Sequence, residues 1–172
     1  YLLGAEGQGF KAIMANFNGE RLGLAAGAIG YAEACFDEAL AWAQQRKTFG
    51  QALVEHQVIR HKLVDMRQRI CASAAWLEDV AARAEAGDAA NDWVADAGIN
   101  DAAWVASVCM LKNQATQTMQ FCADAGVQIL GGMGFMRGTV CERLYREVKV
   151  ITIGGGTEEI MKELAARQWG IV

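Results

Sequence analysis

Residues 24–42 read LAAGAIGYAEACFDEALAW, and this stretch decides the fold class. Its apolar side chains recur every three or four residues, which is the period of one face of an α-helix. They are Leu24, Ala28, Tyr31, Cys35, Ala39 and Trp42. The pattern predicts a helix that ends near Gln45 and begins as early as Gly9, with Asn18-Gly19 as an internal break or a fresh N-cap.

The same period continues in two further stretches. One predicts a helix of roughly 30 residues that stops near Gly87, a residue suited to the C′ position; its apolar positions are Ile59, Leu63, Met66, Ile70, Ala74, Leu77, Ala81 and Ala84. The other ends at the glycines of residues 131–134 and uses Trp104, Val108, Leu111, Ala115, Met119, Cys122 and Gly126. Residues 87–98, between the two, have weak periodicity and form the loosest part of the chain.

Two shorter helices are expected after the glycines, over residues 139–148 and 157–169. Thr157 is suited to cap the second of these, and Glu158 and Glu159 complement the positive end of its dipole. No strand pattern is evident. The sequence therefore predicts an all-α fold, an antiparallel four-helix bundle with extra short helices.

Composition narrows the functional classes. A chain of 172 residues that is 53% apolar forms one domain with a sizeable core, which excludes a disordered segment. The net charge of −4 and the scattered basic residues argue against a nucleic-acid binder. The five cysteines contain no C-x-x-C pair, so we expect them to fill the core of a soluble protein in a reducing compartment, the cytoplasm or, in a eukaryote, the mitochondrial matrix. Neither His56 nor His61 follows a Glu by three residues, so no metal site is expected.

Two constellations have both an ordinary and a functional interpretation. Glu20 and Arg21 lie at the edge of the apolar face, either as a capped first turn behind Asn18 or as charges kept there for chemistry. Residues 46–50, RKTFG, also have two interpretations. They form an ordinary helix C-terminus, or they place Arg46 against a ligand's phosphate and Phe49 beside a ligand's ring. The glycine clusters at residues 131–134 and 154–156 allow a ligand to approach the backbone closely, but neither is the G-x-G-x-x-G of a Rossmann site.

Seven motifs, taken in order, resemble the C-terminal helical domain of the acyl-CoA dehydrogenase family. They are Glu20-Arg21-Leu22 followed by Ala25-Ala26-Gly27-Ala28-Ile29-Gly30; Arg46-Lys47-Thr48-Phe49-Gly50; His56-Gln57; Leu63-Val64-Asp65-Met66; Gln128-Ile129-Leu130-Gly131-Gly132-Met133-Gly134-Phe135; Glu142-Arg143-Leu144-Tyr145-Arg146-Glu147; and Gly155-Gly156-Thr157-Glu158-Glu159-Ile160-Met161. Each motif is weak by itself, but their order and spacing make the resemblance specific.

The resemblance implies an FAD-dependent oxidoreductase of fatty acid metabolism that converts an acyl-CoA to the 2,3-enoyl-CoA and passes electrons to an electron-transfer flavoprotein. It also implies a homodimer or homotetramer. Residues 1–9 would be the exit from a β domain and residues 10–172 the helical domain, so this piece alone is expected to be inactive and to hold no FAD.

The resemblance assigns roles residue by residue. Many members carry the catalytic base in Tyr-Glu-Gly-Thr before the last helix, where this chain has Gly154-Gly155-Gly156-Thr157. The long-chain and isovaleryl-type members carry it in a Glu-Arg-Leu context on the first helix, which Glu20 matches. Substrate contacts are then expected from Asn18, Arg21, Gly155 and Gly156, with the Gly155 N–H on the thioester oxygen. FAD contacts are expected from Arg46, Phe49, His56, Gln57, Gln128, Gly131, Gly132, Thr157 and Glu159, some of them to a neighbouring subunit's flavin.

Three other functions remain open on the same fold. A flavin monooxygenase would need no thioester base, and a nitroalkane oxidase would be expected to carry an acid at position 155. A non-catalytic oligomerisation bundle would have no reason to keep Glu20 beside the core.

Overall fold

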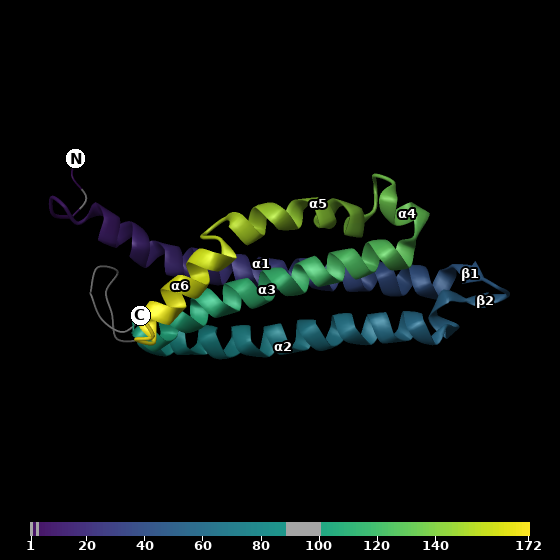
Figure 1. Ribbon diagram of the computed structural model, residues 1–172, viewed down its shortest axis with the longest axis horizontal. Helices are drawn as coiled ribbons and strands as arrows, with labels where there is room; N and C mark the ends of the chain where they lie inside the picture. Colours follow the sequence, from purple (N-terminus) through teal and green to yellow (C-terminus); the bar gives the residue numbers. More distant parts are fainter. Residues whose placement is uncertain (1, 3, 89–100) are drawn as a thin grey trace.

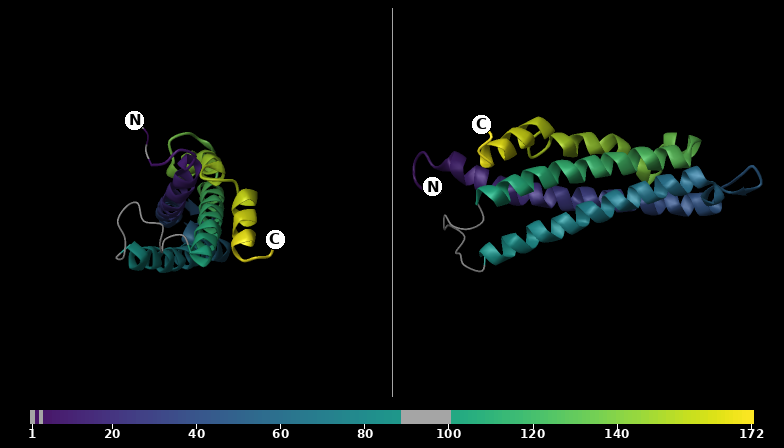
Figure 2. Two further views of the ribbon diagram at one scale, coloured as in Figure 1. Left: turned by 90° about the vertical axis from the view of Figure 1, so that its left-hand side faces the viewer. Right: turned by 60° about the horizontal axis from the view of Figure 1, so that its bottom comes forward.

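The computed structural model describes residues 2, 4–88 and 101–172. Three long helices, α1 (Gly9–Gln45), α2 (Gln57–Asp88) and α3 (Ala102–Leu130), lie along one another (Figure 1). The fourth position of the bundle is occupied by α5 (Val140–Ile153) and α6 (Glu158–Gln168), which follow one another along α3 (Figure 2). The single turn α4 (Gly132–Phe135) links α3 to α5. The all-α prediction is confirmed.

The core lies around α3. All seven positions that the sequence assigned to its inner face are buried, from Trp104 to Gly126. The buried face of α1 consists largely of alanines, which lets α1 approach α3 closely because no long side chain separates the two backbones. Those residues are Ala25, Ala28, Ile29, Ala32, Cys35, Ala39 and Ala43. Tyr31, which the sequence placed on the same face, is 41% exposed.

Two of the expected helix boundaries were wrong. Helix α1 runs unbroken through Asn18-Gly19, because Asn18 uses its side chain to accept a hydrogen bond from Arg21 at 3.0 Å rather than to cap a new helix. Helix α2 is described as far as Asp88, one residue after Gly87, in agreement with the expected stop. Helix α5 extends five residues beyond Val148 because Thr152 is buried and Ile151 packs against the core. Most of the loose stretch, from residue 89 on, lies outside the described residues.

Two local expectations also need correction. A short ladder pairs β1 (Lys47–Thr48) with β2 (Gln51–Ala52) through a two-residue turn, Phe49 and Gly50, both with positive φ. Strands of two residues are too short for alternation to reveal them. Cys71 is exposed, while the other four cysteines are buried as predicted.

Candidate functional site

Glu20 opens onto a groove between α1 and α5. The groove has a volume of about 460 Å³ and is lined by Glu20, Gly23, Leu24, Gly27, Ala28, Tyr31 and Ile151. Positions 20, 23 and 27 share one face of α1, and the two glycines hollow that face because they have no side chain. Glu20 is exposed, and its Oε1 accepts a hydrogen bond from Asn16 Nδ2 at 2.7 Å. A carboxylate therefore stands at one end of a largely apolar groove.

Arg21 turns the other way, into the protein. Its side chain is buried, and its guanidinium lies 5.6 Å from the centre of the Phe17 ring. Nε donates to the carbonyl oxygen of Gly155 at 2.9 Å, and NH1 donates to Asn18 Oδ1 at 3.0 Å. Arg21 thus ties α1 to the segment before α6. Substrate contacts by Asn18 and Arg21 stay predictions.

Gly154–Gly156, the segment that joins α5 to α6, is shaped by its glycines. Gly155 has φ +71 and Gly156 has φ +121, values that side-chain-bearing residues rarely adopt. A Cβ on Gly155 would also lie 2.8 Å from Leu24 Cδ1. The Gly154 and Gly156 N–H groups donate to Val150 and Ile153. Among the described residues, no group accepts a hydrogen bond from the Gly155 N–H, which leaves that donor available.

The start of α6 matches its sequence signals. Thr157 Oγ1 accepts a hydrogen bond from the Ile160 N–H at 3.4 Å, so the predicted cap is confirmed. Hydrogen bonds from its own backbone N–H and from the Thr157 hydroxyl hold the pKa of Glu159 below its usual value. Glu159 is therefore an exposed, ionised acceptor beside the cap.

The remaining residues expected to contact FAD lie at the other end of the bundle. Arg46 is 26 residues along α1 from Glu20, which corresponds to about 39 Å of helix. The β1–β2 turn and α4 both lie at this far end (Figure 1), and they bring with them Phe49, His56, Gln57, Gln128, Gly131 and Gly132. The structure gathers the expected residues into two groups, and it does not bring the groups together.

The far-end group has the chemistry that a flavin dinucleotide needs. Arg46 is exposed, and among the described residues nothing pairs with its guanidinium, which suits a pyrophosphate. The Phe49 ring is 98% exposed and contacts His56 edge to face at 6.3 Å. His56 is held in turn by Thr48 and Gln51, at 3.3 and 3.0 Å. Exposed amides at Gln57 and Gln128 supply donors and acceptors, so these residues fit the cofactor.

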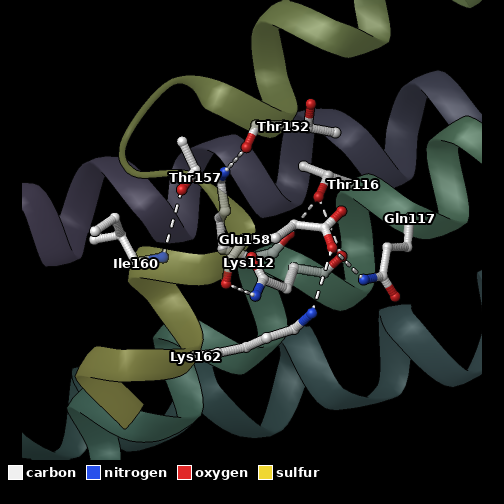
Figure 3. Close-up of polar contacts among 9 residues, drawn as sticks. Lys112, Thr116, Gln117, Thr152, Thr157, Glu158, Ile160 and Lys162 are labelled. Carbon is white, nitrogen blue, oxygen red and sulfur yellow. Dashed lines mark hydrogen bonds and ion pairs between the residues drawn. The ribbon is translucent and has the colours of Figure 1, made fainter.

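Sequence reasoning missed one residue of the site region, Lys112. It is fully buried in α3, and its ammonium donates to the backbone carbonyls of Thr152 (Figure 3) and Gly156, the last residue of the Gly154–Gly156 segment. The available signal was its isolation, since Lys112 is the one charged residue between Asp101 and Asp124. Nothing in the periodicity indicated what it would meet.

Across the part of the chain that the structure describes, no helix combines the length and the apolar character needed to cross a bilayer.

Comparisons with known proteins agree with this architecture. The family model for the acyl-CoA dehydrogenase C-terminal domain matches residues 7–170. The chain is 37% identical to an acyl-CoA dehydrogenase of Bacillus subtilis, with 96% of this chain and 40% of that protein covered. It is 34% identical to an NADH-dependent acryloyl-CoA reductase of Anaerotignum propionicum, over 97% of this chain and 39% of the relative. A crystal structure of a probable acyl-CoA dehydrogenase from Mycobacterium abscessus superposes with a TM-score of 0.86 at 40% identity, covering 98% of this chain and 41% of the other. The chain thus spans about two fifths of the length of these proteins.

Proposed function

The chain belongs to the acyl-CoA dehydrogenase family, as its C-terminal helical domain, and we propose that the full-length protein oxidises an acyl-CoA thioester to the 2,3-enoyl-CoA. Residues 1–9 would then connect a β domain to the helical domain of residues 10–172. FAD, when bound, supplies the acceptor for the hydride that leaves the β-carbon. The protein's own residues have to bind the thioester, orient it and take up the proton that leaves the α-carbon.

The single observation that carries the proposal is the Glu20 carboxylate at the groove. Glu20 is the acidic residue among those that line this groove. When the α-carbon–hydrogen bond breaks, the proton passes to a carboxylate oxygen of Glu20 and the electron pair stays on the substrate. An acyl chain lying along Gly23 and Gly27 would exclude water from the groove in which the carboxylate meets the α-carbon.

Gly155 complements Glu20 in two ways. Its N–H is available as a donor, and a thioester oxygen bound there would have its carbonyl polarised, which acidifies the α-carbon. Its lack of a side chain also fits the proposal, because a carboxylate at position 155 would compete for the space that Leu24 occupies. The acid that position 155 lacks is supplied by α1. Substrate contacts are also proposed for Gly156, Asn18 and Arg21.

The two separate groups of cofactor residues suggest an arrangement of subunits. Thr157 and Glu159 lie at the start of α6, after the glycine segment that Arg21 contacts. Arg46 lies about 39 Å along α1 from Glu20. The other members of the far-end group are Phe49, His56, Gln57, Gln128, Gly131 and Gly132. We propose that the first group contacts the subunit's own FAD and the second contacts the FAD of a neighbour, which requires a homodimer or homotetramer. An electron-transfer flavoprotein would accept the electrons.

The direct test uses the full-length flavoprotein under anaerobic conditions. A panel of straight-chain and branched acyl-CoA thioesters is mixed with it, flavin absorbance is followed, and the product is identified by mass spectrometry. Bleaching of the flavin together with a product two hydrogens lighter is expected for at least one thioester. Reduction by a nitroalkane but by no thioester would overturn the proposal in favour of an oxidase, and reduction by neither would indicate a non-catalytic bundle.

A further inference from the structure

Lys112 is a buried charge to which the proposed chemistry gives no role. Its side chain is fully buried in α3, where its neighbours along the chain are apolar or uncharged. Removing an ammonium from water is costly unless hydrogen bonds replace the water, so its partners indicate what it does.

The partners of Lys112 are two backbone carbonyls. Nζ donates to the carbonyl oxygen of Thr152 at 2.8 Å (Figure 3) and to that of Gly156 at 2.7 Å. Thr152 lies near the end of α5, and Gly156 lies directly before the cap of α6. A single nitrogen therefore spans the Gly154–Gly156 segment from end to end.

Arg21 holds the same segment from the opposite helix. Its Nε donates to the carbonyl of Gly155, so consecutive carbonyls, at Gly155 and Gly156, accept hydrogen bonds from two buried cations on α1 and α3. Three glycines in a row have more backbone freedom than any other tripeptide. The two side-chain donors therefore restrict this segment in addition to the hydrogen bonds that the Gly154 and Gly156 N–H groups make.

We propose that Lys112 is a positioning residue for the thioester-binding N–H of Gly155. This inference rests on the proposed function and deepens it. Lys112 does not touch the substrate; it fixes both ends of the segment, and thereby the orientation of the one N–H left available. The charged groups whose fields reach Lys112 are Glu158 and Arg21, and Glu158 also pairs with Lys162 at 3.7 Å.

The first experiment measures the segment itself and needs no activity. Amide hydrogen exchange of the peptide that covers residues 152–158 is compared in the full-length protein, Lys112→Met and Lys162→Met. Lys162 is an exposed lysine of α6 that pairs with a side chain, so its variant is the matched control. Exchange is expected to rise at least tenfold in Lys112→Met only. An unchanged rate would overturn the inference.

The second experiment measures the consequence for the thioester. In Lys112→Met the rate of flavin reduction at saturating acyl-CoA is expected to fall by about 10- to 100-fold, because a misplaced donor loses transition-state stabilisation. The infrared carbonyl stretch of a bound ¹³C-labelled thioester is expected to shift toward its value in water. Faster exchange with an unchanged rate and stretch would overturn the link to Gly155.

A second variant keeps the inference testable if Lys112→Met does not fold. Lys112→Gln retains an uncharged donor of shorter reach, and intermediate values of exchange, reduction rate and carbonyl stretch are expected. Values equal to those of the unsubstituted protein would contradict a positioning role. If the unsubstituted protein is reduced by no thioester, the proposed function fails; if it is reduced and the Lys112 variants behave identically, only this inference fails.

Discussion

Arg21 Nε lies 2.9 Å from the carbonyl oxygen of Gly155, a hydrogen bond between residues 134 positions apart in the sequence. It joins the helix that carries Glu20 to the segment that offers the Gly155 N–H. The relative position of the two groups proposed to act on one substrate therefore depends on a buried guanidinium.

Replacing Arg21 with Met should destabilise the domain. Met keeps the apolar length but leaves the Gly155 carbonyl without its Arg21 donor, which costs about 1 to 3 kcal/mol. Urea unfolding of the 172-residue chain measures the change. Arg143→Met is the matched control, because Arg143 is half-exposed and, within the described residues, has Glu147 on its own helix as its only ion-pair partner. It should change stability by less than about 0.5 kcal/mol. Equal losses in the two variants would contradict the structural role.

Glu20→Gln should abolish most proton abstraction while preserving shape. In the full-length protein it should bind acyl-CoA and FAD normally but reduce its flavin about 10² to 10⁴ times more slowly. Stopped-flow absorbance measures the rate. A variant as fast as the parent would place the base elsewhere.

The structure sharpens the companion experiment, in which the acid is moved to position 155. Glu20→Gly with Gly155→Glu has to accommodate a side chain at φ +71 and only 2.8 Å from Leu24 Cδ1. Adding Leu24→Ala removes the contact, so the triple variant should recover more of the reduction rate than the double variant.

The isolated 172-residue chain should fold without retaining FAD. Arg46 and Phe49 offer an exposed cation and an exposed ring, but no enclosed site surrounds them within the described residues. Helical circular dichroism together with a protein that is colourless after dialysis against FAD is expected. A stoichiometric yellow complex would contradict this prediction.

The chain should form a homodimer or a larger assembly. The far-end group, which includes Gln128, can contact a flavin held near Glu20 only if that flavin belongs to another subunit. Apolar side chains are also exposed near this end, with Phe135 at 85% and Met136 at 58%. Sedimentation at tens of micromolar should show the assembly, since interfaces of standard size commonly suffice at that concentration. A single monomer peak would argue against the shared site.

Lys112 should make stability rise with pH in the alkaline range. Burial lowers the pKa of Lys112 from its ordinary value of 10.5; Glu158 opposes the shift and Arg21 adds to it. Between the lowered pKa and 10.5, the unfolded chain holds a proton that the folded chain has lost, so stability increases with pH. The free energy of unfolding of the chain minus that of Lys112→Met should grow toward pH 10.5. Urea titrations at several pH values measure it, with Lys162→Met as control, and a flat or falling difference would disagree.

The sequence by itself determined the helices and most of their inner faces. Apolar residues three and four apart located α1, α2 and α3, and Thr157 marked the start of α6, because periodicity and capping depend on neighbours within a few residues. The motifs around Glu20 and Gly155 indicated a base on α1 and a vacant position before α6. That assignment came from the order of the motifs, and it stays a prediction.

Only the tertiary structure decided how these pieces meet. No local pattern shows that Arg21 turns inward to Gly155, that Lys112 bridges Thr152 and Gly156, or that Leu24 fills the space beside Gly155. These contacts join residues 40 or more positions apart, and they depend on how α1, α3 and α5 pack. Periodicity reports which side chains face inward, whereas the partner that each one finds there is set by the packing of distant segments.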